Sequence, residues 1–271
     1  MTGPWDTVRL DSACDGVRVV TMHRPEARNA LTDQLVTELA EAFEAVSRDE
    51  SCHVIVLTGA GQAFCAGLDL NDYGDAGQVI EQGELRRTLT RQVEIAGLVT
   101  RMRRLRQPIV AAVNGAAAGG GLALVLASDI RLASREAVFA VSFIRAGYSG
   151  CDIGTSWLLP RIVGAGRAHE LMLTGRRFDA SEAERIGLVT KVVEPARLEE
   201  EALATVALLQ RNPPLSLELT KQGMWTALEM PAFASAVEYE NRQQVITALT
   251  ADRVEATRAF LEKRDPVYRY R

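Results

Sequence analysis

Hydrophobic residues fall along most of the chain in short runs that are separated by segments with helical spacing. The runs at 17–22, 54–58 and 109–113 are rich in β-branched residues and are typical of buried strands. Between the first two, at 32–47, apolar residues recur every three or four positions, which predicts an amphipathic helix with Thr32 as its N-cap. Strands that alternate with helices in this way indicate parallel strands joined by helical crossovers, and therefore an α/β fold.

The stretch at 108–130 joins a strand to an apolar helix through three consecutive glycines. These are Gly119, Gly120 and Gly121, and the helix is predicted over 122–127. Glycines allow a backbone to approach a ligand closely, and the first N–H groups of a helix favour negative charge. No Lys-Ser or Lys-Thr pair follows, as a phosphate-binding P-loop requires. The glycines therefore indicate either a site for a developing oxyanion or a tight contact between the helix and a strand.

A second turn that contains glycine follows the strand at 54–58, in the sequence QAFCAGLDL at 62–70. Two such turns in one core can each direct one backbone N–H at the same oxygen, which is how an oxyanion hole is built. Residues 71–90 are polar and weakly patterned, as expected of a mobile flap over a pocket. A long helix is predicted after them, from about 89 to 105.

From residue 196 onward the pattern consists of helices alone, which are predicted at 198–210, 215–224, 233–247 and 252–263. Exposed apolar faces on such helices are consistent with an assembly surface. The sequence is therefore divided into two regions, 1–195 and 196–271.

The composition is that of an ordinary globular protein and argues against several functions. Charged residues make up 24% of the 271 residues and the net charge is −4, so no basic surface for nucleic acid is indicated. No apolar run has the length needed to span a membrane. The four cysteines lie far apart with no nearby histidines, which argues against both disulfides and a metal site. A cytoplasmic location is therefore the expectation.

Five motifs follow one another over almost the whole chain. They are RPEARNAL at 24–31, AFCAGLDL at 63–70, AAVNGAAAGGGLALVLASDI at 111–130, LLPRIVGAGRAHELMLTGRRFDASEAERIGLVTKVV at 158–193 and AFLEKR at 259–264. In this order they resemble the crotonase superfamily, the family of enoyl-CoA hydratases and isomerases. The resemblance implies a crotonase fold, in which a spiral of ββα turns builds two roughly perpendicular sheets over 1–195 and a helical trimerisation region follows over 196–271.

The same resemblance implies an acyl-CoA thioester as substrate, no separate cofactor, no metal, and a homotrimer or a hexamer made of two trimers. It assigns an oxyanion hole to the backbone N–H groups of Leu68 and Gly120, which would polarise the thioester carbonyl. Arg24 and Arg28 match positions that contact the CoA phosphates. Phe260 and Lys263 match positions that contact the CoA of a neighbouring subunit. The full set assigned to substrate and CoA binding is Arg24, Arg28, Ala66, Gly67, Asp69, Phe143, Phe260 and Lys263.

Hydratases of this family carry two glutamates that position and activate water, and neither is present here. Their positions hold Ala123 and Phe143, which cannot transfer protons. One carboxylate, Asp152 in SGCDIGTSWLLPRIVG, matches a position where some members of the family carry a working aspartate. Asp152 also precedes a predicted helix, where aspartate is a good N-cap, so a catalytic role and a capping role both stay open.

Three functions follow as hypotheses. The first is an acyl-CoA enzyme that stabilises a thioester enolate and transfers a proton with Asp152 as acid and base, in double-bond isomerisation or hydration. The second is a dehalogenase- or thioesterase-like enzyme in which Asp152 is the nucleophile. Thr100 weakens the dehalogenase alternative, because that branch of the family carries histidine at the matching position. The third is a non-catalytic acyl-CoA-binding protein that has kept the oxyanion hole.

Overall fold

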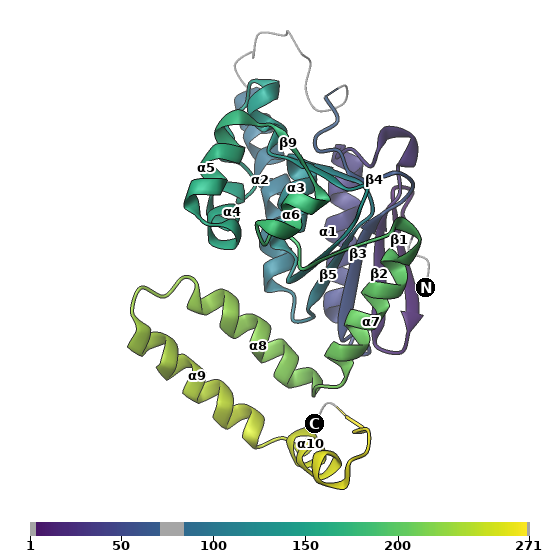
Figure 1. Ribbon diagram of the computed structural model, residues 1–271, viewed down its shortest axis with the longest axis vertical. Helices are drawn as coiled ribbons and strands as arrows, with labels where there is room; N and C mark the ends of the chain where they lie inside the picture. Colours follow the sequence, from purple (N-terminus) through teal and green to yellow (C-terminus); the bar gives the residue numbers. More distant parts are fainter. Residues whose placement is uncertain (1–3, 71–83, 270–271) are drawn as a thin grey trace.

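The computed structural model describes residues 4–70 and 84–269, and it shows two sheets surrounded by helices (Figure 1). The strands are β1 (Val8–Cys14), β2 (Val17–Met22), β3 (Val54–Gly59), β4 (Ala63–Cys65), β5 (Ile109–Val113), β6 (Ala116–Ala118), β7 (Ile130–Ser134), β8 (Val138–Ala140), β9 (Arg177–Asp179) and β10 (Lys191–Val193). The helices are α1 (Asp33–Arg48), α2 (Glu84–Arg104), α3 (Gly120–Ala127), α4 (Thr155–Val163), α5 (Ala165–Thr174), α6 (Ala180–Arg185), α7 (Leu198–Gln210), α8 (Pro214–Ala227), α9 (Phe233–Ala248) and α10 (Ala251–Glu262). Short 3₁₀ helices are η1 (Pro25–Ala27), η2 (Ser142–Ala146) and η3 (Pro195–Arg197).

The larger sheet has the strand order β1-β2-β3-β5-β7-β10, and the smaller one has the order β4-β6-β8-β9. Neighbouring strands are parallel except β1 with β2 and β8 with β9. Along the chain, a strand of the larger sheet is followed by a strand of the smaller sheet and then by a helix, as in β3-β4-α2 and β5-β6-α3. This repeated ββα unit confirms the fold that the motifs predict.

The main core lies between the sheets and helices α1 to α4, whose apolar side chains form one continuous cluster with the strands. The opposite face of the larger sheet packs against α7, through a second cluster that includes Val54, Val110 and Ala202. Helix α3 is buried along its whole length, from Gly120 to Ala127. A helix that is apolar on all sides needs such an environment, because it has no polar face to turn to solvent.

Most elements lie where the pattern predicts them. The strands at 17–22 and 109–113 are confirmed, and Thr32 caps α1 by accepting a hydrogen bond from Leu35 N. Helix α2 starts at Glu84, earlier than predicted, and strand β1 was not predicted, although its first four residues alternate between apolar and polar. The first part of the expected flap, residues 71–83, lies outside the described residues.

A buried lysine and a tryptophan attach helix α8 to the core. Lys221 is 1% exposed, and its Nζ donates hydrogen bonds to the carbonyl oxygens of Met102 and Gln107. It also forms an ion pair with Asp129, with 3.0 Å between Nζ and Oδ2. The carboxylate of Asp129 accepts further hydrogen bonds from Trp225 Nε1 and Ile109 N. Helix α8 is therefore held at the end of α2 and at the turn between α3 and β7.

Helices α9 and α10, here called the C-terminal arm, extend away from the sheets (Figure 1). Helix α9 has no buried residue, and several large apolar side chains of the arm are exposed, namely Phe233, Val245, Ile246, Leu249, Val254, Phe260 and Leu261. The division of the chain at residue 196 and the role of the arm in trimer formation stay predictions. Within residues 4–70 and 84–269, no helix is both long enough and apolar enough to cross a membrane.

Candidate active site

The two glycine-containing turns predicted from the sequence lie against each other. Gly67, in the turn after β4, has a φ of 97°, and a Cβ there would lie 2.8 Å from Ala118 O and 3.7 Å from Gly119 Cα. Gly119, the residue before α3, has a φ of 51°. Both backbone conformations favour glycine because L side chains rarely adopt them. The parallel pairing of β4 with β6 therefore brings the loop after β4 to the N-terminus of α3.

The backbone N–H of Leu68 is available at this junction. Leu31 N donates to Gly67 O, and Asp69 N donates to Leu31 O, in an isolated parallel bridge. Successive amides of an extended segment point to opposite sides, so this bridge leaves the N–H of Leu68 directed away from Leu31. In the described part of the chain, the amide of Leu68 donates no hydrogen bond.

The backbone N–H of Gly120 is the second available group. The first hydrogen bond of α3 runs from Ala123 N to Gly119 O, so the amide of Gly120 has no partner in its own helix. It donates to no other group within 4–70 and 84–269. A Cβ at Gly120 would lie 2.6 Å from Leu31 Cδ1 and 3.4 Å from Ile153 Cδ1, so these side chains pack against the first turn of α3.

A cleft of about 610 Å³ opens beside the junction of the two turns. Its walls come from the turn after β4, from β6, from β8 with η2, and from the start of β9. The lining residues are Arg28, Ala66, Leu68, Leu70, Ala116, Ala118, Gly119, Val138, Phe139, Ala140, Ser142, Phe143, Arg145, Ala146, Tyr148, Gly175 and Arg177. Among the positions assigned to the site from the sequence, Arg28, Ala66, Leu68 and Phe143 lie here.

The cleft carries positive charge. Arg28, Arg145 and Arg177 line it, and no aspartate or glutamate is found among the described residues of the lining. Among the described residues, none of these three guanidinium groups forms an ion pair, which suits an anionic ligand. The sequence motifs did not reveal Arg145 and Arg177, because they reach the cleft only through the packing of η2 and β9.

Arg24 and Asp69, both assigned to CoA binding from the sequence, bind each other. The distance from Arg24 NH1 to Asp69 Oδ2 is 3.2 Å, and the side chains are only 20% and 14% exposed. Arg24 NH1 also donates to Ala30 O. This pair ties the loop after β2 to the loop after β4, and so holds the two loops that flank the cleft. Contact of either side chain with CoA stays a prediction.

Asp152 lies in the loop between η2 and α4. Its Oδ1 accepts hydrogen bonds from Ile153 N at 2.7 Å and from Gln92 Nε2, on α2, at 2.5 Å. Helix α4 begins at Thr155 and its N-cap is Gly154, with no side-chain capping bond. The prediction that the Asp152 side chain caps this helix is therefore wrong. Two intervening residues with positive φ, Ile153 and Gly154, place the carboxylate outside the first turn of α4.

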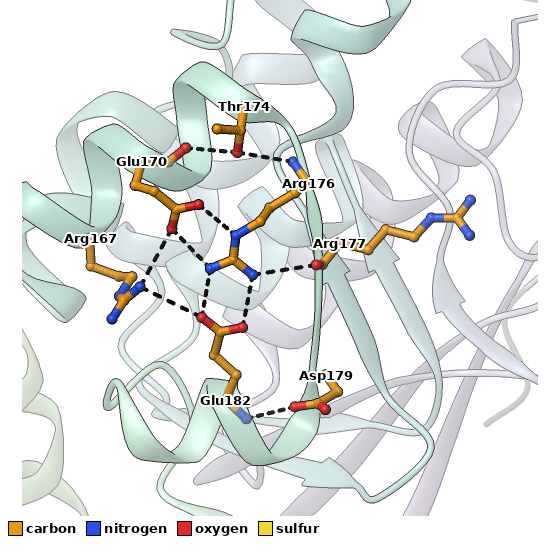
Figure 2. A network of polar contacts seen from close by, with 7 residues as sticks. All are labelled: Arg167, Glu170, Thr174, Arg176, Arg177, Asp179 and Glu182. Atoms are coloured by element: carbon orange, nitrogen blue, oxygen red, sulfur yellow. Dashed lines mark hydrogen bonds and ion pairs between the residues drawn. The ribbon is translucent and has the colours of Figure 1, made fainter.

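An ionic network holds the wall of the cleft that carries Arg177 (Figure 2). Arg176 donates to both oxygens of Glu170, at 2.5 and 2.9 Å, and to both oxygens of Glu182, at 2.8 and 2.6 Å. Hydrogen bonds from Arg176 lower the pKa of both carboxyl groups below the ordinary value. In Figure 2 the Arg177 side chain points away from this network. The network thus fixes α5, β9 and α6 together beside the cleft.

The remaining positions singled out in the sequence either lie far from the cleft or carry side chains that cannot transfer protons or act as nucleophiles. Ala123 is buried inside α3, and Phe143 lines the cleft while only 5% exposed. Phe260 is 82% exposed on α10, and Lys263 ends that helix, far from α3 within one chain (Figure 1). Burial raises the pKa of the Cys65 thiol to about 12, which argues against a nucleophilic role. The described residues contain no cluster of three or more His, Cys, Asp or Glu side chains suited to a metal.

The chain is similar in sequence and structure to enoyl-CoA hydratases and isomerases. Residues 12–271 match the family model described as enoyl-CoA hydratase/isomerase. A protein of Mycobacterium bovis named as a probable enoyl-CoA hydratase is 39% identical over 250 residues, which cover 92% of this chain and 88% of the relative. The 1,2-epoxyphenylacetyl-CoA isomerase of Escherichia coli is 36% identical over 261 residues, covering 93% and 95%. The crystal structure of an enoyl-CoA hydratase from Bacillus anthracis gives a TM-score of 0.91 at 31% identity, covering 98% and 100%.

The repeated ββα units and the paired glycine turns define a protein of the crotonase superfamily. The chain belongs to the enoyl-CoA hydratase/isomerase family and is an enzyme of that family. The resemblance seen in the sequence motifs is thereby confirmed for family, fold and enzyme class.

Proposed function

We propose that the protein acts on acyl-CoA thioesters by stabilising an enolate between the amides of Leu68 and Gly120 and moving a proton through Asp152. The observation that carries this proposal is that two turns meet beside the cleft, each with an amide that has no partner among the described residues. A thioester oxygen that accepts both N–H groups gains negative charge as the enolate forms. The N-terminal end of α3 favours that charge.

The cleft suits the CoA portion of such a substrate. Arg28, Arg145 and Arg177, which form no ion pair with any described residue, offer cationic partners for phosphate groups. Both relatives described above carry names that refer to CoA thioesters.

The carboxylate at Asp152 favours double-bond isomerisation among the reactions of this family. Ala123 and Phe143 provide neither of the two glutamates with which hydratases handle water. A single carboxylate suffices to remove a proton from one carbon and return it to another. The side chain of Ile153, the next residue in the chain, packs against the first turn of α3 at Gly120, which supports a role for Asp152 at the proposed enolate site.

The test is an assay of the purified protein with 2-enoyl-, 3-enoyl- and dienoyl-CoA thioesters, together with the variant Asp152→Asn. We expect the wild type to isomerise 3-enoyl or dienoyl thioesters, and the variant to lose roughly 10²–10⁴-fold in kcat. A matched control is Asp179→Asn, since Asp179 caps α6 and asparagine caps equally well.

Each other outcome assigns a different function. Hydration of 2-enoyl thioesters that depends on Asp152 would keep the site and change the reaction. A covalent adduct on Asp152 after rapid quench would indicate the nucleophilic alternative. A wild-type rate in Asp152→Asn would remove Asp152 from the mechanism. Binding of acyl-CoA without any turnover would indicate a protein that only binds.

We also propose that the C-terminal arm joins copies of this chain into a trimer or a hexamer. Its exposed apolar residues support this proposal, because a monomer gains nothing from them. Phe260 and Lys263 stand on the arm, so in such an assembly they are the residues of this chain suited to reach CoA bound by a neighbouring copy.

A further inference from the structure

Asp152 is held by a partner from a distant part of the sequence. Gln92 on α2 donates from Nε2 to Asp152 Oδ1 at 2.5 Å, across 60 positions of the sequence. The backbone N–H of Ile153 donates to the same oxygen at 2.7 Å. Oδ1 therefore receives two hydrogen bonds, whereas Oδ2 receives none from the described residues. The two oxygens of this carboxylate are in different environments.

The backbone that carries Asp152 is also fixed. Ile153 has a φ of 47°, a left-handed conformation that β-branched residues rarely adopt. Its side chain is 5% exposed and packs against the first turn of α3 at Gly120. Thr155 N donates to the carbonyl oxygen of Asp152 at 2.8 Å. Surrounding contacts thus hold a strained residue in place, a feature that often accompanies functional sites.

Helix α2, which carries Gln92, is held in place by core packing and by an ion pair. Ile95 and Leu98, in the following turn, are each 1% exposed and belong to the main core. Arg91 is paired with Asp33 on α1, with Nε at 3.0 Å from Oδ1. Gln92 itself is half-buried, and an amide is neutral, so it orients the carboxylate without cancelling its charge. A supporting hydrogen bond from a rigid element is what keeps a catalytic group in position.

We propose that Gln92 is a positioning residue that occupies Oδ1 of Asp152 and leaves Oδ2 as the atom that exchanges the proton. The inference rests on the proposed function of Asp152. In the reaction, Oδ2 takes a proton from the carbon next to the thioester, and the C–H electron pair moves into the enolate held by the two amides. The O–H bond formed at Oδ2 then breaks as the proton is delivered to the far carbon of the double bond, which restores the thioester and the carboxylate.

The experiment is a double-mutant cycle with Gln92→Met and Asp152→Asn, measured as kcat and KM on the 3-enoyl or dienoyl thioester that the wild type isomerises. Methionine keeps the length of the side chain and removes the donor. We expect Gln92→Met to lower kcat roughly 10–100-fold with little change in KM, because a misplaced catalytic group slows chemistry and leaves binding intact. In the Asp152→Asn background, the same substitution should change kcat less than about twofold, since Gln92 acts through the carboxylate.

The matched control is Gln222→Met on α8, where a glutamine amide also donates to a carboxylate, that of Glu218. This variant should keep the wild-type kcat. A second variant, Gln92→Asn, keeps the amide but shortens the side chain by one methylene group, and it should behave like Gln92→Met. Thermal unfolding of each variant checks that the fold is kept.

The outcomes separate this inference from the proposed function. Loss of activity in Asp152→Asn with a wild-type kcat in both Gln92 variants overturns the role of Gln92 alone. Equal losses from Gln92→Met in both backgrounds also overturn it, because they indicate a structural effect. A wild-type rate in Asp152→Asn, or no turnover of any thioester by the wild type, overturns the proposed function and the inference with it.

Discussion

Helix α3 and the C-terminal arm both carry apolar side chains, but α3 buries all of its residues while the arm exposes most of its large ones. Every residue of α3 is buried, and Gly121 lies directly against the backbone of β4 at Cys65. Helix α9 buries no residue, and Phe233 and Leu249 are 85% and 83% exposed. The sequence of α3 is thus explained by contacts within one chain. For the exposed apolar residues of the arm, we propose contacts with another copy of the chain.

Helix α8 lies between these two cases and shows what attaches the arm to the core. Its contact with the core depends on Lys221, whose pKa is lowered by burial. Lys221 donates to two carbonyl oxygens and to an aspartate. Three acceptors around one ammonium group fix the orientation of α8 against the core as well as its position. These polar contacts therefore help to set the position of α8, from which α9 and α10 continue.

The largest effect is expected at the second residue of α3. A Cβ at Gly121 would lie 2.1 Å from Cys65 O, a backbone atom of β4 that cannot move aside. Gly121→Ala should therefore lower the free energy of unfolding by on the order of 4–5 kcal/mol or abolish folding. The matched variant Gly223→Ala on α8, where the nearest atom is 3.9 Å away, should raise stability by about 0.5–1 kcal/mol. Chemical denaturation measures both, and equal effects would contradict the contrast between the two regions.

The next effect is expected at the buried ion pair of α8. Lys221→Met leaves Asp129 charged and buried without its cation, which should cost about 3–5 kcal/mol of unfolding free energy. Lys191→Met is the control, because its ion pair with Glu201 is half exposed and should contribute no more than about 1 kcal/mol. If the two substitutions cost the same in urea denaturation, α8 is not anchored by its buried lysine.

A smaller effect with a defined pH dependence is expected at the network around Arg176. The folded-state pKa values of Glu170 and Glu182 lie below the ordinary 4.5, so their stabilisation is present above that value and is lost as pH falls through the folded-state values. These groups are partly exposed, so Arg176→Met should cost about 1 kcal/mol at pH 7. The difference from wild type should shrink toward zero below pH 4.5. A difference that stays constant with pH would show that packing, and not charge, accounts for the cost.

The smallest effect on the stability of the chain is expected in the arm. There, the quantity to measure is the oligomeric state. Leu249→Ser should change the unfolding free energy of the chain itself by no more than about 0.5 kcal/mol, because the side chain has few contacts within the chain. We expect sedimentation to show a trimer or hexamer for the wild type and dissociation for the variant. Leu173→Ser on α5, 74% exposed, is the control outside the arm. A wild-type monomer at micromolar concentration would contradict the assembly proposal.

Much of the fold and part of the site could be predicted because their signals are local. The strands at 17–22 and 109–113 are rich in β-branched apolar residues, and the three glycines at the start of α3 mark the turn that leads into it. The motifs that surround Leu68 and Gly120 indicate the two turns that the structure brings together, and the oxyanion role of their amides stays a prediction. The proposed role uses only the backbone amide at each position, so it can be predicted without knowing how distant side chains pack.

The rest depended on contacts between distant residues. The pairing of Gln92 with Asp152 spans 60 positions, and no motif contains both. The capping prediction for Asp152 failed because Ile153 adopts a left-handed conformation that its residue type disfavours. Lys221 is a charged residue on a helix, which a sequence pattern places in solvent, and only its partners in the core explain its burial.

The central claim is that one site both stabilises a thioester enolate and moves a proton through Asp152. Exchange of the α-protons of a saturated acyl-CoA with D₂O tests it most directly, because exchange requires the enolate and the base but no net reaction. Mass spectrometry should show deuterium uptake with the wild type and a roughly 10²–10⁴-fold slower uptake with Asp152→Asn. Uptake at the same rate in both proteins, or no uptake while the thioester is bound, would contradict the account.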